Sequence, residues 1–249
     1  MHTRAYKKNS NTDCAVIFIH GFMGSPNQFD DLTDTAYDIG CTCISVLLPG
    51  HGVRANEFVK FGVSDWQNHL QSEIDKIGHG YKKIFLVGHS MGGLLALNAS
   101  LIKENNISGV VLISTPLKVY WFNRNKLRLL LFPKDNEIKS MYLKSNSIDI
   151  SGPFFYPSAI KPVIEVYKLM RQTKKHLPEV FVPVYMFHSK GDEATAYKSA
   201  DLLYKGLCNT QRTAFSLDKS WHAFYDGDER EIMRNKLVEF IQANGACSV

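Results

Sequence analysis

Features that would indicate a membrane span or a metal site are missing from this sequence. No apolar run approaches the ~18 residues that cross a bilayer. The polar stretch Met1–Lys8 lacks the apolar run of a signal peptide. The five cysteines are odd in number and do not have metal-site spacing. Cys41 and Cys43 fall two apart on an expected strand, which favours buried free thiols. We therefore expect a cytoplasmic protein in a reducing compartment, with export as the alternative.

What the sequence does contain is an alternation of strands and helices. The 249 residues are 45% hydrophobic and 21% charged, as in a single globular domain with a substantial core. The apolar run 13–19 is typical of a strand buried on both faces of a parallel sheet. The alternation predicts a mostly parallel α/β sheet with helices on both faces, and ligands bind such sheets beyond the carboxyl ends of the strands. The expected strands are 13–19, 42–47, 83–87, 109–113, 182–187 and 213–217, and the expected helices begin near 25, 64, 91, 196 and 229.

One segment, Leu117–Val180, breaks the alternation. It has aromatic and aliphatic clusters but no clear buried strand, and it carries twelve Lys and Arg against five Asp and Glu. An insertion of this length predicts a small cap (117–180) on a core formed by 1–116 and 181–249. Its basic and aromatic residues are compatible with weak contact to an anionic lipid surface. The favoured interpretation is that the apolar residues line a pocket, because no helix there shows a clean basic amphipathic face.

A strand-to-helix junction carries the strongest chemical signal. Gly88-His89-Ser90-Met91-Gly92 fits the G-x-S-x-G nucleophile elbow, with a predicted strand before it and an apolar helix after it. The tight turn leaves no room for a Cβ two residues before or after the serine. We therefore predict that Ser90 is a nucleophile.

A serine nucleophile needs a base and a group that orients the base. In hydrolases of this architecture these follow in the order acid, then histidine. Asp192 comes just after a turn glycine beyond the strand 182–187, and it is preferred to its neighbour Glu193, whose alternative interpretation is a solvated acid at a helix start. His222 is the histidine beyond the last strand, with His188 as the second candidate.

The loop after the first parallel strand is a candidate for the oxyanion hole. His20-Gly21-Phe22-Met23-Gly24 would supply the N–H of Phe22, and Met91 would supply the N–H that follows the nucleophile. A plain strand-to-helix turn would explain the glycines equally well. His20 and His51 flank glycines at strand ends, and we expect both to hold loops by hydrogen bonds.

Taken together, these motifs resemble a known group of enzymes. With Leu48-Pro49-Gly50-His51-Gly52 added, they look like the bacterial carboxylesterase and monoacylglycerol lipase group of the α/β-hydrolase superfamily, over all of the chain except 117–180. The resemblance implies that Ser90, Asp192 and His222 form a catalytic triad, that Phe22 and Met91 form the oxyanion hole, and that a small lid covers an acyl pocket. It also implies no metal and no organic cofactor.

The sequence departs from the resemblance in two places. Trp221 stands where many relatives have glycine, so the local backbone or pocket rim is expected to differ. The N-terminus is short, so the antiparallel strands that begin larger relatives must be trimmed or absent.

The leading hypothesis is a serine esterase that cleaves carboxylic esters of short to medium acyl chains, including monoacylglycerols. A thioesterase, an acyltransferase or an amidase would use the same triad, because only the acceptor or the bond cleaved differs. A non-catalytic binding protein of hydrolase shape is the third hypothesis. The expected partner is a small ester substrate. Nucleic acid is not expected, because the excess basic charge lies in an apolar insert.

Overall fold

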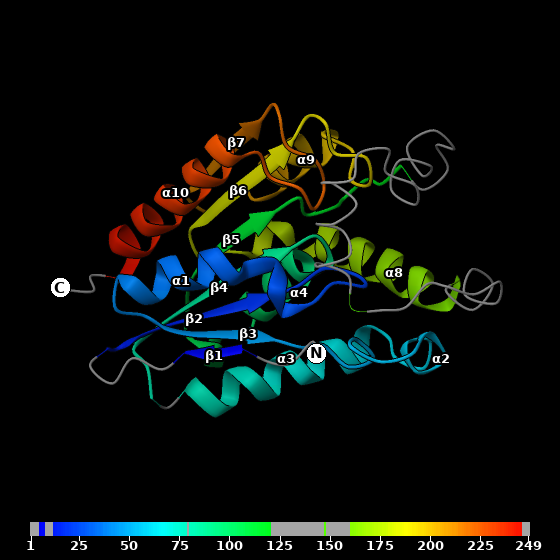
Figure 1. Ribbon diagram of the computed structural model, residues 1–249, viewed down its shortest axis with the longest axis horizontal. Coiled ribbons are helices and arrows are strands. Elements are labelled where there is room, and N and C mark those ends of the chain that lie inside the picture. Colours follow the sequence, from blue (N-terminus) through cyan, green and yellow to red (C-terminus); the bar gives the residue numbers. More distant parts are fainter. Residues whose placement is uncertain (1–4, 8–11, 79, 121–146, 148–159, 246–249) are drawn as a thin grey trace.

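A seven-stranded sheet forms the centre of the computed structural model (Figure 1). The structure describes residues 5–7, 12–78, 80–120, 147 and 160–245. The strand order is β1-β3-β2-β4-β5-β6-β7, and every neighbouring pair is parallel except β1 with β3. The strands are β1 (Ala5–Lys7), β2 (Cys14–Ile19), β3 (Thr42–Val46), β4 (Lys83–His89), β5 (Ile107–Ile113), β6 (Val184–Ser189) and β7 (Arg212–Leu217).

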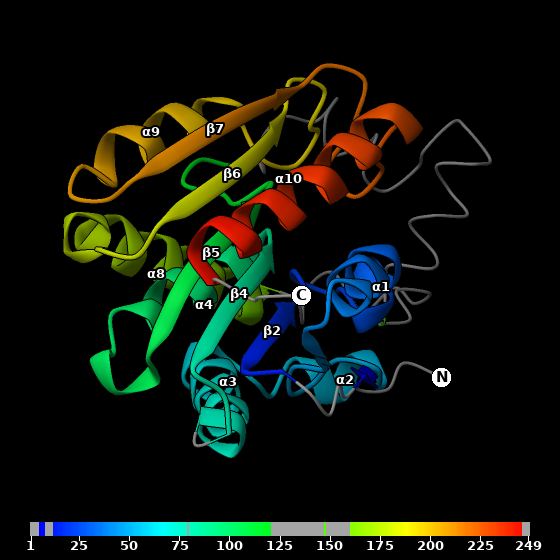
Figure 2. The same ribbon diagram turned by 90° about the vertical axis from the view of Figure 1, so that its left-hand side faces the viewer.

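Helices cover both faces of this sheet. Figure 2 shows α1 (Asp30–Asp38) and α10 (Gly227–Gly245) on one face, and α3 (Val63–Gly78), α4 (Met91–Ser100), α8 (Ile160–His176) and α9 (Lys198–Gly206) on the other. Two clusters of buried side chains correspond to these two layers, and Phe85 and Leu86 of β4 point into opposite ones. The strands β2, β3 and β4 are buried along nearly their whole length. Their carboxyl ends lie at one edge of the sheet, and the loops that carry the candidate polar residues begin at that edge. The short helical elements are η1 (Pro26–Phe29), α2 (Ala55–Phe58), η2 (Lys103–Asn105) and η3 (Leu177–Glu179).

The predicted α/β fold is confirmed, and most element ends differ from the prediction by one to three residues. The strand β1 was not predicted, because three residues carry too little pattern. It is a single short antiparallel strand where larger relatives were expected to have more. Cys41 and Cys43 are buried thiols outside any disulfide among the described residues, as expected. Within the described ranges, no helix has the length and apolar character needed to cross a bilayer.

Part of the predicted cap packs directly on the core. The helix α8 lies against α4 and α3, and the Nδ2 of Asn98 donates to the Oγ1 of Thr173 at 2.7 Å. Val119 forms an isolated antiparallel bridge with Thr195. The backbone N–H of Ser147 donates to the carbonyl of Met23 at 2.9 Å, so the insert contacts the loop that follows β2. The aromatic and aliphatic clusters predicted within 121–146 and 148–159 lie outside the described residues.

Candidate active site

Ser90 lies between β4 and α4 in a backbone conformation that L-residues seldom adopt, with φ +51° and ψ −118°. The surrounding backbone is too close for larger residues. A Cβ on Gly88 would lie 2.5 Å from the backbone of Gly92, and a Cβ on Gly92 would lie 1.9 Å from the carbonyl oxygen of Ile19. The Ser90 N–H donates to the carbonyl of Ile113 at 2.8 Å, which ties the turn to β5. These contacts hold the strained turn that the pattern predicts.

Ser90, His222 and Asp192 come together at the carboxyl edge of the sheet. The Oγ of Ser90 is 3.1 Å from Nε2 of His222, and Nδ1 of the same ring is 2.8 Å from Oδ2 of Asp192. The other carboxylate oxygen of Asp192 accepts the N–H groups of Ala194 at 2.8 Å and Thr195 at 2.6 Å. These two bonds hold the Asp192 carboxylate at the oxygen that faces away from the His222 ring. The structure places Asp192, and not Glu193, on the imidazole.

The pKa values of His222 and Asp192 depend on each other. Burial lowers the pKa of His222, but the charge and hydrogen bond of Asp192, together with the charge of Glu193, outweigh it and raise the pKa overall. Burial raises the pKa of Asp192, but His222 and the two backbone N–H groups outweigh it, so the net shift is downward. The arrangement favours an ionised aspartate beside a histidine that gains a proton readily.

Three side chains hold the main chain of His222, and sequence reasoning missed them. Glu193 is 2% exposed, so its interpretation as a solvated acid is wrong. Its Oε2 accepts the N–H of His222 at 3.1 Å. The His222 carbonyl accepts Nε2–H of His89 and the hydroxyl of Tyr225, both at 2.8 Å. His89 precedes the serine directly, so the histidine main chain is bonded to the elbow itself.

His89 serves as a donor in this contact. Burial, with a smaller contribution from the charge of His222, lowers the pKa of His89 to about 3, so its ring is neutral. Beside it, the N–H of Trp221 donates to the carbonyl of Phe224 at 2.7 Å and closes a turn around His222. The position of His89 inside the elbow pattern was the only signal in the sequence that could have indicated this contact.

The loop after β2 passes directly against the elbow. A Cβ on Gly21 would lie 3.0 Å from the Cβ of Ser90. On either side of Phe22, the Gly21 N–H donates to Oε1 of Gln28 at 3.3 Å and the Met23 N–H donates to Nε2 of His51 at 3.1 Å. These bonds hold the Phe22 amide within a fixed loop beside Ser90.

The other candidate histidines are structural. His20 accepts the N–H of Leu48 through Nε2 at 3.1 Å, so His20 and His51 hold loops by hydrogen bonds as predicted. Burial lowers the pKa of His51 to about 4. The Nε2 of His188 lies 3.0 Å from the carbonyl of Thr115, and burial lowers the pKa of His188 too.

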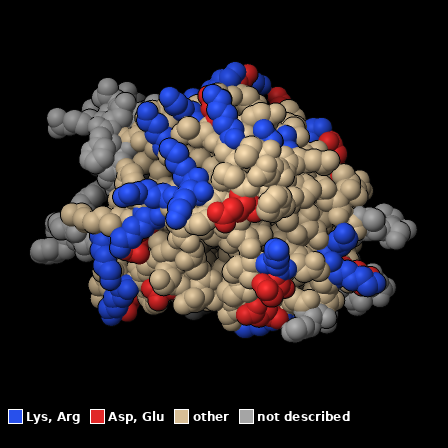
Figure 3. Space-filling view, turned by 180° about the vertical axis from the view of Figure 1, so that it is seen from behind, with Lys and Arg blue, Asp and Glu red and all other residues tan. Residues whose placement is uncertain are grey.

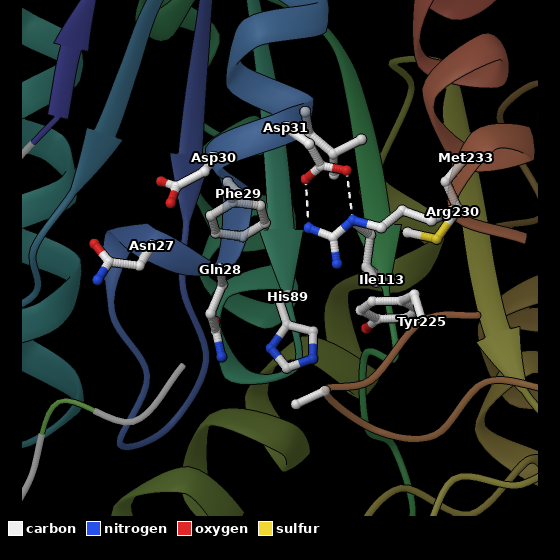
Figure 4. A pocket seen from close by; sticks show the side chains of 12 residues that line it. Asn27, Gln28, Phe29, Asp30, Asp31, His89, Ile113, Tyr225, Arg230 and Met233 are labelled. Carbon is white, nitrogen blue, oxygen red and sulfur yellow. Dashed lines mark hydrogen bonds and ion pairs between the residues drawn. The ribbon is translucent and has the colours of Figure 1, made fainter. Parts of the chain in front are cut away.

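A pocket of about 300 Å³ lies behind the elbow, on the side of α1 and α10. Figure 4 shows the ring of His89 at its base and the ion pair of Arg230 with Asp31 across it. Ala223 and Tyr225, from the loop that carries His222, also line it. Ser90 and His222 are not among its lining residues, so this pocket does not adjoin the Ser90 hydroxyl. Among the described residues, no cluster of three or more His, Cys, Asp or Glu could hold a metal ion.

A serine on a strand-to-helix elbow at the carboxyl edge of a parallel sheet, with a histidine and an aspartate arriving later in the chain, defines an α/β-hydrolase fold. The sequence profile of one family of this fold, described as "Serine aminopeptidase, S33", matches residues 10–229. The chain belongs to that family.

Similar proteins confirm the resemblance seen in the motifs. The chain is 24% identical over 241 residues to a thermostable monoacylglycerol lipase of Bacillus sp. (strain H-257), covering 94% of this chain and 93% of that protein. It is 21% identical over 231 residues to a carboxylesterase of Bacillus subtilis (strain 168), covering 92% and 93%. The crystal structure of Paleococcus ferrophilus monoacylglycerol lipase superposes with a TM-score of 0.71 at 18% identity, covering 97% of this chain and 98% of that one. At these identities the structural likeness shows the fold alone.

Proposed function

We propose that this protein is a serine esterase that cleaves carboxylic esters of short to medium acyl chains, including monoacylglycerols. The observation that carries the proposal is the hydrogen-bonded series of Ser90, His222 and Asp192. The fold and the lipase and carboxylesterase relatives support it. Three side chains from separate loops, in this order and at these distances, have the geometry that acyl transfer through serine requires.

Each residue then has a defined role. Ser90 Oγ attacks the ester carbonyl while His222 Nε2 takes its proton, and the N–H groups of Phe22 and Met91 stabilise the oxyanion. Collapse of the tetrahedral intermediate breaks the bond to the alcohol oxygen, which receives the proton from His222 and leaves an acyl-enzyme. Water then attacks the acyl carbonyl while His222 takes its proton, the bond from the acyl carbon to Ser90 Oγ breaks, and Ser90 regains the proton from His222 as the acid leaves. Asp192 holds the imidazole tautomer throughout.

The test is the substitution Ser90→Ala, assayed with a chain-length series of nitrophenyl esters and with monoacylglycerol. We expect loss of hydrolysis at unchanged thermal stability. Ser100→Ala is the matched control, because Ser100 lies at the end of α4 and its hydroxyl donates to the Leu97 carbonyl of the same helix at 2.8 Å. A serine-directed phosphonate should label the natural protein on Ser90. If Ser90→Ala kept most of the activity, the nucleophile would be misassigned.

Amide hydrolysis is the second candidate. It is favoured by the family description, which names an aminopeptidase. The acyl-enzyme is common to both reactions, so the site geometry fits an amide or a thioester as well as an ester. Turnover of matched ester, thioester and amide substrates with one acyl group separates these activities. The esterase proposal requires the ester to be cleaved with the highest kcat/KM.

We also propose that residues 117–180 act as a cap on a core of 1–116 and 181–249. Supporting this, Ser147 is buried, and its hydroxyl donates to the carbonyl of Gly24 at 2.6 Å, in the loop assigned to the oxyanion hole. Replacement of Ser147 with alanine should therefore change kcat by altering that loop. An unchanged kcat would mean that the contact of Ser147 with the loop after β2 does not affect the reaction.

A further inference from the structure

Helix α8 presents two different sides. Toward the core it buries Pro162, Leu169, Met170 and Thr173. On the opposite side an exposed line of side chains runs the length of the helix at spacings of four, four, three and four residues. These spacings keep the line on one side of the helix. The line consists of Ile160, Ile164, Lys168, Arg171 and Lys175, with Lys161 and Lys174 exposed at its margins.

The charge on this helix is strongly one-sided. It contains five Lys and Arg and a single acid, Glu165. Glu165 is 2.5 Å from Lys168 and also accepts the N–H of Val63, and the hydrogen bond from Lys168 lowers its pKa. Figure 3 shows Lys and Arg side chains gathered in a band over one half of the face that α3, α8 and α9 cover. The helix therefore contributes cations to a broad basic surface.

Two isoleucines lie in the same exposed line. Ile160 is 59% exposed and Ile164 is 49% exposed, one turn apart at the start of the helix. Contact with a polyanion would not bury these aliphatic side chains, whereas contact with a bilayer would. Cations beside exposed aliphatic residues on one side of a helix are typical of a helix that lies in the interface of a membrane.

The position of α8 in the fold is compatible with contact to a membrane. It connects β5 to β6, which are parallel neighbours, so it begins at the carboxyl edge of the sheet and runs back toward the amino edge (Figure 1). The two isoleucines are therefore at the same end of the molecule as Ser90. A lipid surface on this side would lie beside the sheet edge that carries Ser90.

We propose that the exposed face of α8 docks on an anionic phospholipid bilayer, with Ile160 and Ile164 entering the headgroup region and the lysines and arginine contacting lipid phosphates. The purpose of such docking rests on the proposed esterase function, since it would bring lipid esters to Ser90. The sequence pattern did not single out this face of α8, which combines cations with two isoleucines. Its buried side includes proline and threonine, which hydropathy does not mark as core.

Binding is measured by co-sedimentation with phosphatidylcholine vesicles containing increasing phosphatidylglycerol. The protein used is the full chain carrying Ser90→Ala, so that no lipid is hydrolysed. We expect the partition coefficient to rise with the phosphatidylglycerol fraction and to fall with salt, because exposed charges are screened. The proposed esterase activity is assayed separately on soluble esters with the natural protein. Either proposal can therefore fail without the other.

Two sets of variants in the Ser90→Ala background locate the surface. Arg171→Gln with Lys175→Gln should lower the partition coefficient by about fivefold per cation. The control, Lys82→Gln with Lys236→Gln, removes the same charge from other parts of the surface and should change it by less than about twofold. Ile160→Ser with Ile164→Ser should weaken vesicle binding while leaving retention on heparin unchanged. Circular dichroism and thermal melts verify folding of each variant.

Three results would overturn the proposal. Sedimentation that does not depend on phosphatidylglycerol would exclude an anionic lipid surface. An equal loss of vesicle binding in the α8 pair and the control pair would mean that binding depends on the net charge of the protein and not on α8. Retention on heparin without vesicle binding would assign the face to a polyanion.

Discussion

Replacing His89 with leucine should slow the reaction by displacing His222 while leaving substrate binding nearly unchanged. The His89 ring donates to the His222 carbonyl at 2.8 Å, and leucine keeps a similar volume but has no donor. The hydroxyl of Tyr225 donates to the same carbonyl at 2.8 Å, so the oxygen retains one partner. The loss of one of two bonds should cost about 1 kcal/mol of stability. For a chain of this size that lowers Tm by about 2–4 °C.

The effect on rate should be larger than the effect on stability. A displacement of the base by about 1 Å can cost about a hundredfold in rate. Since the remaining bond limits the movement, we expect kcat to fall about 10- to 100-fold with KM nearly unchanged. His89→Gln carries an amide N–H that can reach the same carbonyl, so it should recover most of kcat. A residue that only filled space would not show this difference between leucine and glutamine.

Combining His89→Leu with Tyr225→Phe tests the reasoning further. With both donors gone the carbonyl has no partner from either side chain, and the cost should exceed the sum of the single costs, reaching about 2–3 kcal/mol. The assay is nitrophenyl ester hydrolysis with kcat and KM resolved, together with thermal melts. If His89→Leu retained kcat within about twofold, or if glutamine and leucine behaved alike, the contact would not position the base.

Other substitutions probe the neighbouring contacts. Asp192→Asn should lower kcat by about 10⁴-fold in steady-state assays while circular dichroism shows an intact fold, because the imidazole loses the partner that fixes its tautomer; a loss of less than about tenfold would reassign the acid. Glu193→Gln should move the acidic limb of the kcat/KM pH profile to lower pH, because the Glu193 charge raises the pKa of His222, and the base must be neutral to act; a shift to higher pH would contradict this sign. Gly92→Ala should unfold the protein or lower its Tm strongly in a thermal melt, since the added Cβ would lie 1.9 Å from a backbone oxygen; a Tm within about 2 °C of the natural protein would mean that the turn can relax.

The local sequence pattern was sufficient to predict the parallel sheet and the nucleophile elbow. The run 13–19 is apolar at nearly every position because β2 is buried on both faces, and burial of that kind is visible in a single sequence. Gly88 and Gly92 are required by backbone contacts within one turn, so the pattern carries its own geometry. Asp192 and His222 could be named because chain order and strand ends limit the choices.

Residues whose role depends on distant partners were interpreted less well. Glu193 looked like a solvated acid because nothing near it in the chain shows that His222, 29 positions later, covers it. The exposed face of α8 was missed because its buried side is defined by α3 and α4, and not by its own hydropathy.

The sequence by itself determined the sheet, the order of the loops and the residue types at the carboxyl edge, since periodicity and backbone crowding act over a few residues. Only the tertiary structure decided which side chains hold the main chain of His222 and which side of α8 remains exposed. Apart from the Tyr225 hydroxyl, those contacts join elements that are 29 or more positions apart in the chain. Their energies depend on burial that no local pattern specifies.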